Sequence, residues 1–263
     1  MNLTSPQNER VKQVVKLRQR SHRDELGLML IEGYRELKRA LDNHHNPSAL
    51  YYCPAFYQGN HEPELVARCR AAGAALFECA EAAFAKMSYR DRPEGLLAVA
   101  PRIHRTLADL TLPAPALVLV AEAIEKPGNL GTMLRSSDAA GVHALIVCDP
   151  CTDVNNPNVV RASIGTLFAV PVAEAPAAET LAWLRARQIR ILAATPHAEA
   201  EYFDVDLRPP TAIVVGTEQY GLSPAWLEQA DLKVRIPMRG QADSLNVAAA
   251  TTLLLYEALR QRR

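Results

Sequence analysis

Residues 212–224 read Ala-Ile-Val-Val-Gly-Thr-Glu-Gln-Tyr-Gly-Leu-Ser-Pro, and this stretch decides the fold class. Its apolar run shows no polar alternation, which predicts a strand that is buried on both faces, as in a parallel sheet. Ser223 followed by Pro224 predicts the start of a helix, because proline suits the first helical position. Between them lies a loop with two glycines and a carboxylate, Glu218. A buried strand that leads through such a loop into a helix is typical of α/β folds, in which ligands bind at the carboxyl ends of the strands.

The same alternation of buried strands and helices extends to both sides of this stretch. Strand-length apolar runs occupy residues 116–121, 144–147, 168–172, 189–193 and 212–215. Helical patterns occupy residues 129–140, 157–166, 179–187, 224–229 and 244–260. The sequence therefore predicts an open α/β layer structure with a parallel sheet.

The first 100 residues form a different pattern. Helical periodicity dominates residues 1–40, and short apolar runs further along predict strands. The expected strands are residues 28–31, 49–53, 74–77 and 96–100, with a helix near 63–72. Prolines at 101, 113 and 115 restrict the chain to extended conformations, which marks a domain boundary. We therefore expect a small α/β domain over residues 1–105 and a second domain over 106–263.

The charge of the chain is balanced overall but not along its length. Lysine and arginine total 29 and aspartate and glutamate total 29, so the formal net charge is zero. Residues 1–105 hold 16 basic and 12 acidic side chains, and residues 106–263 hold 13 and 17. The basic excess lies mainly within residues 10–23. It is either a solvated helix face or a phosphate-contacting edge, and the sequence alone does not separate these interpretations.

Five cysteines are present, at positions 53, 69, 79, 148 and 151. An odd number without a recognisable secretory signal argues against a disulfide framework. Cys148 and Cys151 have the C-x-x-C spacing, but no second pair of ligands stands at a suitable distance for zinc. We interpret them as strand-end thiols, with a redox or metal role as the alternative. No apolar stretch approaches the length of a membrane span, so we expect a cytoplasmic protein. Because the second pair of ligands is missing, we also expect no metal.

Three segments that follow strands carry the candidate chemistry. In the first, Asn129, Gly131 and Arg135 open the helix after residues 116–121, with Asn129 as the expected N-cap. The second is the loop of Glu218. Its glycine spacing resembles a phosphate-binding loop, but Leu222 replaces the required lysine, which argues against nucleoside triphosphate binding.

The third segment runs from residue 234 to residue 250 and ends in an Ala/Leu-rich helix. Ser244 and Asn246 lie at the start of this helix, where free backbone N–H groups collect. Simple helix capping explains these two residues as well as a binding role does.

Together, and in this order, the segments resemble the SpoU family (also called the TrmH family) of RNA ribose 2′-O-methyltransferases. The matching residues are Asn129, Gly131 and Arg135; Gly216, Glu218 and Gly221-Leu-Ser223; and Ile236-Pro-Met238 with Ser244-Leu-Asn246-Val247. Residues 161–165, Arg-Ala-Ser-Ile-Gly, also resemble the family. The resemblance covers residues 116–260, and residues 1–100 resemble, more loosely, the family's substrate-binding domain of the ribosomal protein L30e type.

The resemblance implies a deep trefoil knot in the C-terminal domain, with S-adenosylmethionine bound in a bent form within it. The positions that match the family's cofactor-binding residues are Gly216, Ile236, Leu245, Thr195 and Met238. It also implies a homodimer that acts on RNA.

The same resemblance assigns the catalytic roles. The family's motif arginine corresponds to Arg135, which is proposed to activate the ribose hydroxyl. A guanidinium stays protonated at ordinary pH, so we expect it to hold a phosphate and stabilise developing negative charge. Glu218 would position Arg135 or its loop, and Asn129, Ser244 and Asn246 would orient the ribose.

Ribosomal RNA is the expected substrate, because the N-terminal domain resembles the L30e type. Three alternatives remain open: a transfer RNA 2′-O-methyltransferase, a non-catalytic RNA-binding protein on the same fold, and a base methyltransferase with the related knotted architecture. The Asn129–Arg135 element favours ribose chemistry, and a near-neutral charge favours recognition of RNA shape or a basic surface made by a dimer.

Overall fold

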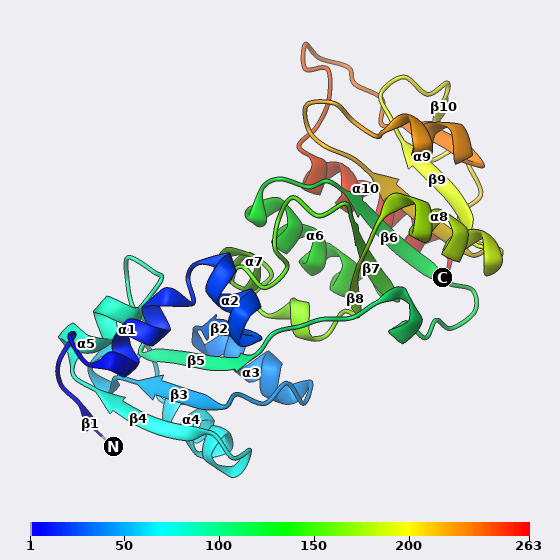
Figure 1. Cartoon of the computed structure of the whole chain (residues 1–263). Helices are drawn as coiled ribbons and strands as arrows, with labels where there is room; N and C mark the ends of the chain where they lie inside the picture. Colours follow the sequence, from blue (N-terminus) through cyan, green and yellow to red (C-terminus); the bar gives the residue numbers. More distant parts are fainter. Residues whose placement is uncertain (1) are drawn as a thin grey trace. The chain divides into compact units, whose positions relative to one another are not determined.

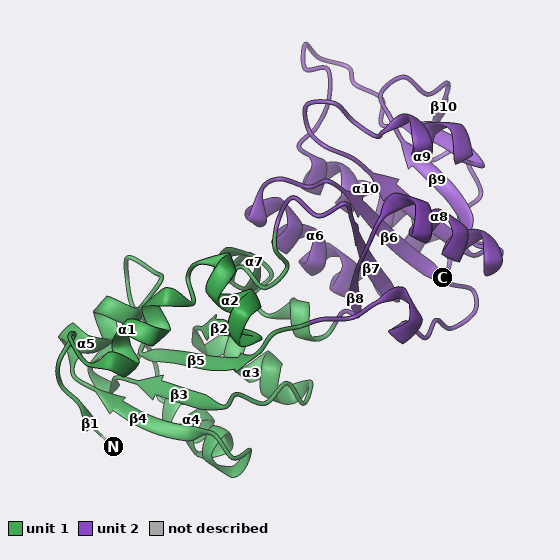
Figure 2. Cartoon of the chain, in the orientation of Figure 1, with its two compact units in different colours: residues 1–103, 153–169 green, residues 104–152, 170–263 purple. Residues whose placement is uncertain are grey.

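The computed structural model describes residues 2–263, which form two compact units (Figure 2). Unit 1 contains the residues up to Ile103 together with Asp153–Ala169. Unit 2 contains His104–Thr152 and Val170–Arg263. The chain first passes from unit 1 to unit 2 after Ile103, which is two residues before the boundary expected after residue 105. Asp153–Ala169, which lies inside the second domain expected from the sequence, packs with unit 1.

Buried contacts hold the returning segment in unit 1. Helix α7 (Pro157–Ala162) packs against β2, and the 3₁₀ helix η3 (Thr166–Phe168) packs against α3. The guanidinium of Arg23, which is 2% exposed, donates from Nε to Asp153 Oδ2 at 2.9 Å. Because removal of one partner would leave a buried charge unpaired, this pair fixes the segment strongly.

Unit 1 is built on a five-stranded mixed sheet with the order β1-β4-β3-β5-β2. Strands β1, β4 and β3 are parallel, and β5 runs antiparallel to both β3 and β2. The strands are β1 (Asn2–Leu3), β2 (Leu28–Glu32), β3 (Ala49–Tyr52), β4 (Ala75–Cys79) and β5 (Leu96–Pro101). The longer helices are α1 (Glu9–Lys16), α2 (Arg20–Leu26), α3 (Tyr34–Asp42), α4 (Glu62–Ala71) and α5 (Glu81–Met87), with the short η1 (Pro54–Phe56). The four strands expected in this part of the sequence are confirmed.

Unit 2 is built on a seven-stranded sheet in which every pairing is parallel, with the order β10-β12-β9-β11-β6-β7-β8. The strands are β6 (Leu117–Glu122), β7 (Ala144–Cys148), β8 (Val172–Ala175), β9 (Arg190–Ala194), β10 (Ala200–Glu201), β11 (Thr211–Val215) and β12 (Leu232–Arg235). Every residue of β6, β7 and β11 is buried, which confirms the parallel α/β prediction. The strand expected at residues 168–172 is wrong, because residues 166–168 form η3 and β8 begins only at Val172.

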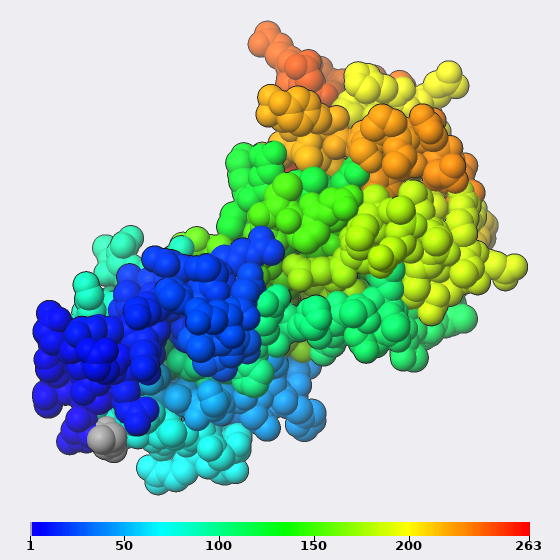
Figure 3. Space-filling view, viewed as in Figure 1, coloured from blue at the N-terminus to red at the C-terminus, as the bar shows by residue number. Residues whose placement is uncertain are grey.

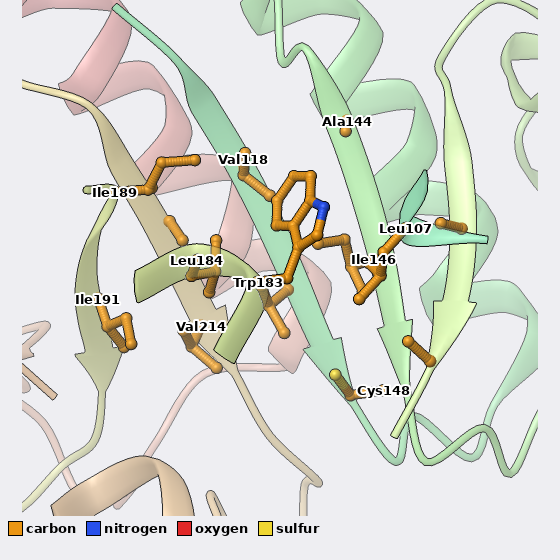
Figure 4. Close-up of a cluster of buried hydrophobic side chains, with 14 of the residues drawn as sticks. Leu107, Val118, Ala144, Ile146, Cys148, Trp183, Leu184, Ile189, Ile191 and Val214 are labelled. Atoms are coloured by element: carbon orange, nitrogen blue, oxygen red, sulfur yellow. The ribbon is translucent and has the colours of Figure 1, made fainter. Parts of the chain in front are cut away.

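Helices cover the sheet of unit 2 in layers (Figure 1). Helices α6 (Pro127–Ala140) and α10 (Val247–Gln261) pack against each other, and so do α8 (Ala177–Ala186) and α9 (Pro224–Gln229). The 3₁₀ helix η2 (Leu107–Asp109) precedes β6. In Figure 4 the indole of Trp183 lies over β6 and β7 among Val118 and Ile146, and Trp226 belongs to the same buried cluster. This apolar layer fixes the strand ends from which the candidate loops emerge.

The strand order places two candidate segments next to each other. Strand β11 pairs with β6 along its full length, and Val215 lies opposite Ala121. Parallel neighbours end at the same edge, so the loops that follow β6 and β11 start side by side. Strand β12 is one position further out, beyond β9. Its following loop must therefore span this edge before α10 begins at Val247.

The five thiols differ sharply in exposure. Cys151 is exposed, and the other four are buried. Cys148 donates to Thr180 Oγ1 at 3.2 Å inside the core of unit 2, and burial raises its pKa to about 12. These neighbours support the structural interpretation of the C-x-x-C pair.

We expect one fast-reacting thiol in the native protein. At pH 8 an aromatic disulfide reagent should modify Cys151 within the mixing period, since attack requires an accessible thiolate. The others should react only as the chain unfolds, and burial raises the pKa of Cys79 to about 12 and of Cys69 to about 11. A spectrophotometric count should give one thiol, and none after Cys151→Ser. Two or more fast thiols would contradict this assignment.

Residues 2–263 contain no helix that is both long and apolar enough to cross a membrane. Nor does this part of the chain bring three His, Cys, Asp or Glu side chains together in a way that could hold a metal ion.

Candidate active site

The three candidate segments meet at the carboxylate of Glu218. Its Oε1 accepts hydrogen bonds from Asn246 Nδ2 at 2.7 Å and from Asn129 Nδ2 at 2.9 Å. Its Oε2 forms an ion pair with Lys126 Nζ. Asn246 Nδ2 also donates to Asn129 Oδ1 at 3.2 Å. We call these four side chains the Glu218 cluster; it joins the loops after β6, β11 and β12.

The cluster keeps Glu218 ionised. The hydrogen bond from Lys126 and then that from Asn129 lower the pKa of this carboxyl, and the same contact raises the pKa of Lys126. A carboxylate held as an acceptor is a weak base, so it is suited to holding N–H donors in place rather than to transferring protons.

The lowered pKa predicts how the stability conferred by Glu218 depends on pH. The contribution is fully present above the ordinary value of 4.5 and is lost as the pH falls through the lower value of the folded protein. The difference in melting temperature between the wild type and Glu218→Gln should therefore stay constant from pH 7 to pH 5 and shrink below about pH 4.5. A difference that grows on acidification would show that the cluster does not stabilise the anion.

Asn246 has two functions through two different atoms. It is the N-cap of α10, and its Oδ1 accepts from the backbone N–H of Ala248 at 3.0 Å and of Ala249 at 3.4 Å. Its Nδ2 donates to Glu218 and Asn129. The same side chain therefore caps α10 and contacts the Glu218 cluster. It links the start of α10 to Glu218 and Asn129.

Asn129 is not the N-cap of its helix, contrary to the expectation. Helix α6 begins at Pro127, and Lys126 occupies the capping position without a side-chain hydrogen bond. Proline at the first helical position lacks the N–H that would need a cap, and the capping position lies three residues upstream of the expected one. This shift leaves the Asn129 amide free to donate to Glu218.

The loop that carries Glu218 is a tight reverse turn. Thr217 and Gly221 exchange two backbone hydrogen bonds of 3.0 and 3.1 Å. A Cβ atom at Gly216 would lie 2.2 Å from the carbonyl oxygen of Gly221, and Gly221 has a φ of +70°. The turn itself therefore requires glycine at position 216, independently of any ligand.

Two residues of the site escaped the sequence interpretation. Lys126 supplies the cation for Glu218, and its only signal is its position just before a helix-starting proline. Glu122 ends β6, is 5% exposed, and accepts from the backbone N–H of Ser223 at 2.9 Å. It thereby ties the end of β6 to the start of α9. A carboxylate that closes a buried strand was the available sequence signal.

Arg135 and Ser244 lie outside the Glu218 cluster. Arg135 is exposed on α6, six residues or about 9 Å of helix rise beyond Asn129. Within residues 2–263 its guanidinium has no hydrogen bond or ion pair, so Glu218 does not hold it directly. Ser244 is exposed in the loop before α10, and its hydroxyl has no partner in the described chain.

The predicted cofactor-binding residues are distributed along the carboxyl edge of the sheet. Gly216 is buried, Thr195, Ile236 and Met238 are half-buried, and Leu245 is 39% exposed. Thr195 donates from its backbone to Val234, which joins the ends of β9 and β12 at 2.9 Å. Figure 3 shows the segment after β12, in orange and red, at the surface.

The backbone at these positions fits an adenosine-type cofactor. In the part of the chain that the structure describes, the N–H groups of Gly216, Ile236, Met238 and Leu245 have no intramolecular partner. A buried backbone donor without a partner is rare, so the free N–H of Gly216 favours an external acceptor. Apolar Ile236, Met238 and Leu245 beside these donors suit a ligand with an aromatic base and polar edges.

Comparison with known proteins identifies the family. The sequence model of the SpoU rRNA Methylase family matches residues 116–256. The chain belongs to this family. A second model, the MRM3-like substrate binding domain, matches residues 8–98.

Curated SpoU-type relatives include ribosomal RNA enzymes. The 23S rRNA (guanosine(2553)-2′-O)-methyltransferase RlmP of Bacillus subtilis is 29% identical, and the alignment covers 97% of each chain. The 23S rRNA (uridine(2479)-2′-O)-methyltransferase of Streptomyces viridochromogenes is 44% identical, but that alignment covers 52% of this chain and 50% of the relative. The chain thus spans about half the length of that relative.

Solved SpoU-type structures resemble the whole chain. The crystal structure of an RNA 2′-O ribose methyltransferase is 45% identical, with a TM-score of 0.88 and coverage of 100% and 99%. An AdoMet-bound rRNA methyltransferase from Sinorhizobium meliloti is 31% identical, with a TM-score of 0.90 and coverage of 99% and 97%. The family and its α/β fold are therefore as the sequence motifs predict, and the parallel sheet is consistent with the knotted SpoU fold.

Proposed function

We propose that this protein transfers a methyl group from S-adenosylmethionine to a ribose 2′-hydroxyl of ribosomal RNA. The Glu218 cluster carries the proposal, because it gathers Asn129 from the first turn of α6, Glu218 from the loop after β11 and Asn246 from the start of α10 at one sheet edge. Membership of the SpoU family and relatives that are named 23S rRNA 2′-O-methyltransferases support it.

The cofactor would lie against Gly216, Ile236 and Leu245, with Thr195 and Met238 at its margins. It supplies an electrophilic methyl group on sulfur. The free backbone N–H groups would hold its polar edges, while the apolar side chains exclude water from the reacting atoms. An AdoMet-bound structural relative supports the choice of cofactor.

The chain would mainly align the ribose and stabilise charge. The residues of the site would align the 2′-oxygen with the methyl group that the bound cofactor supplies, and the hydroxyl proton would pass to solvent. Arg135 would hold the neighbouring phosphate and stabilise the developing alkoxide, since a guanidinium is a poor base. Asn129, Ser244 and Asn246 would orient the ribose, and Glu218 would fix the two asparagine amides.

Unit 1 would contribute RNA binding, as its match to a substrate-binding domain suggests. We also propose a homodimer, because Leu253 and Tyr256 on α10 are 39% and 46% exposed although both are large and apolar. A ribosomal RNA substrate would place the protein in the cytoplasm.

Transfer of a tritiated methyl group tests the function. Purified protein should label 23S rRNA, and not bulk transfer RNA, in the presence of methyl-labelled S-adenosylmethionine. Alkaline hydrolysis should leave the label in an alkali-resistant dinucleotide, because a methylated 2′-oxygen cannot attack its phosphate. Label in mononucleotides would indicate base methylation, and no label with any RNA would favour a non-catalytic binding protein.

A further inference from the structure

The aromatic ring of Tyr220 is open to solvent beside the Glu218 cluster. Tyr220 is 78% exposed, and Leu26, at 55%, is the next most exposed large apolar side chain of residues 2–263. In the part of the chain that the structure describes, the hydroxyl of Tyr220 has no hydrogen bond and its ring has no aromatic or cationic partner. Single exposed aromatic residues are common, so the position of this ring decides what it can do.

The turn that carries Tyr220 fixes its backbone. Thr217 and Gly221 exchange two backbone hydrogen bonds, so residues 218–220 form the tip of the turn. The hydroxyl oxygen of Thr217 also accepts from the backbone N–H of Tyr220 at 2.9 Å. None of these three hydrogen bonds uses the phenol side chain. The ring is therefore presented from a fixed point, and its removal should leave the turn intact.

The same turn would contact both reactants of the proposed methyl transfer. At its start, Gly216 has a free backbone N–H for the cofactor. At its tip, Glu218 accepts hydrogen bonds from the two asparagine amides that would orient the ribose. The Cα atoms of Glu218 and Tyr220 lie at most about 7 Å apart, because two residues of chain span no more. A base is bonded directly to its ribose, so the ring of Tyr220 is within reach of the base.

Contacts to a ribose alone leave the nucleotide partly free. Hydrogen bonds can hold the sugar, but the base still rotates about its bond to the sugar and the strand still pivots. In-line attack on a methyl group needs a fixed orientation, which a base stacked on an aromatic side chain helps to supply. Every base has a π-face, so such a ring fixes the position of a base without reading its identity.

We propose that Tyr220 stacks on the base of the nucleotide whose ribose is methylated. The ring contacts the substrate, and the phenol hydroxyl is not required. This inference rests on the proposed action on an RNA ribose and adds the residue of unit 2 that holds the base of the target nucleotide.

Steady-state methyl transfer to 23S rRNA tests the proposal. A stack that is equally strong in the bound complex and in the transition state changes KM and leaves kcat unchanged. Tyr220→Ala should therefore raise KM for the RNA by about 5- to 150-fold, the effect of losing one base–aromatic stack. The value of kcat and KM for S-adenosylmethionine should stay at their wild-type values. A purely structural role of the side chain would not raise KM for the RNA alone.

Two variants of the same turn serve as controls. Tyr220→Phe keeps the ring and should keep the wild-type KM, because stacking uses the ring face. Gln219→Ala removes the neighbouring exposed side chain and should also leave KM unchanged. A wild-type KM in Tyr220→Ala would overturn the proposal. So would an increase in either control as large as that in Tyr220→Ala.

A tryptophan at position 220 provides a direct readout of the stack. The two tryptophans of the chain, Trp183 and Trp226, are 9% and 0% exposed, so an exposed indole in Tyr220→Trp would dominate the emission that a ligand can quench. Hexaadenylate, added while S-adenosylhomocysteine fills the cofactor position, should quench this emission, because a base stacked on an indole quenches its fluorescence. Gln219→Trp should be quenched far less. No quenching at position 220, or equal quenching in both variants, would contradict a defined stack.

These measurements separate the stack from the proposed function. Quenching specific to position 220 without methylation of any RNA would refute the proposed function and leave the stack supported. Methylation with an unchanged KM in Tyr220→Ala would refute the stack alone. Sedimentation velocity tests whether the ring instead meets a second copy of the chain: a smaller assembly in Tyr220→Ala than in the wild type would overturn the proposal.

Discussion

Arg135→Ala is expected to lower the turnover number by about 10²–10³-fold, because removal of one group that stabilises transition-state charge has effects of this size. The free energy of unfolding should change by less than about 0.5 kcal/mol, which is the usual range for substitutions at exposed positions. This separation follows from the structure, since Arg135 is exposed on α6 and has no intramolecular partner within residues 2–263. Single-turnover methyl transfer and thermal unfolding measure the two quantities.

Arg135→Lys distinguishes charge from geometry. Lysine keeps the positive charge but lacks the planar fork, so we expect a rate between those of the wild type and the alanine variant. Lys233→Ala, which removes an exposed cation elsewhere in unit 2, is the control and should keep full activity. Near-wild-type turnover in Arg135→Ala would eliminate the proposed catalytic role.

Asn246→Asp is expected to separate the capping role of Asn246 from its contact with Glu218. Aspartate remains a good N-cap, so α10 should keep its start, whereas Asn246→Ala should lose about 0.5–2 kcal/mol of stability. Both variants should lower turnover by about 10²-fold, the cost of misplacing reacting groups by about 1 Å. In the aspartate variant an oxygen replaces the donor that lies 2.7 Å from Glu218, so two carboxylates repel each other.

A capping residue in unit 1 supplies the matched control. Asn156 caps α7 and accepts from the backbone N–H of Asn158 at 2.8 Å, but it does not belong to the Glu218 cluster. Asn156→Ala should lose stability on the scale of Asn246→Ala and keep its turnover number. If Asn246→Asp also retained full turnover, the Glu218 cluster would be only a structural tie between loops.

Local sequence patterns predicted the buried strands and those helices whose first residues carry a clear start signal. Helix α9 runs over Pro224–Gln229, as Ser223 and Pro224 indicate, because a cap and a first-position proline act within one turn. The buried strands β6, β7 and β11 follow from continuous apolar runs for the same local reason. The start of α6 was mispredicted, since Asn129 and Pro127 are both credible start signals and the proline is the one that acts.

The family motifs identified most residues of the Glu218 cluster but not which of their side chains contact one another. Asn129, Glu218 and Asn246 were expected at one site, whereas Lys126 was missed and Arg135 does not join them. The side-chain direction along a helix separates Asn129 from Arg135, because six residues advance the chain by 240° around the axis.

The sequence by itself determined most of the longer strands, the approximate helix positions and the family, since these depend on neighbours within a few residues. Only the tertiary structure decided which loops meet and which unit receives Asp153–Ala169. Asn129 and Glu218 are 89 positions apart, and Asn129 and Asn246 are 117 apart. Contacts over such separations depend on the order of strands in the sheet and on buried pairs such as Arg23 with Asp153, which no local pattern encodes.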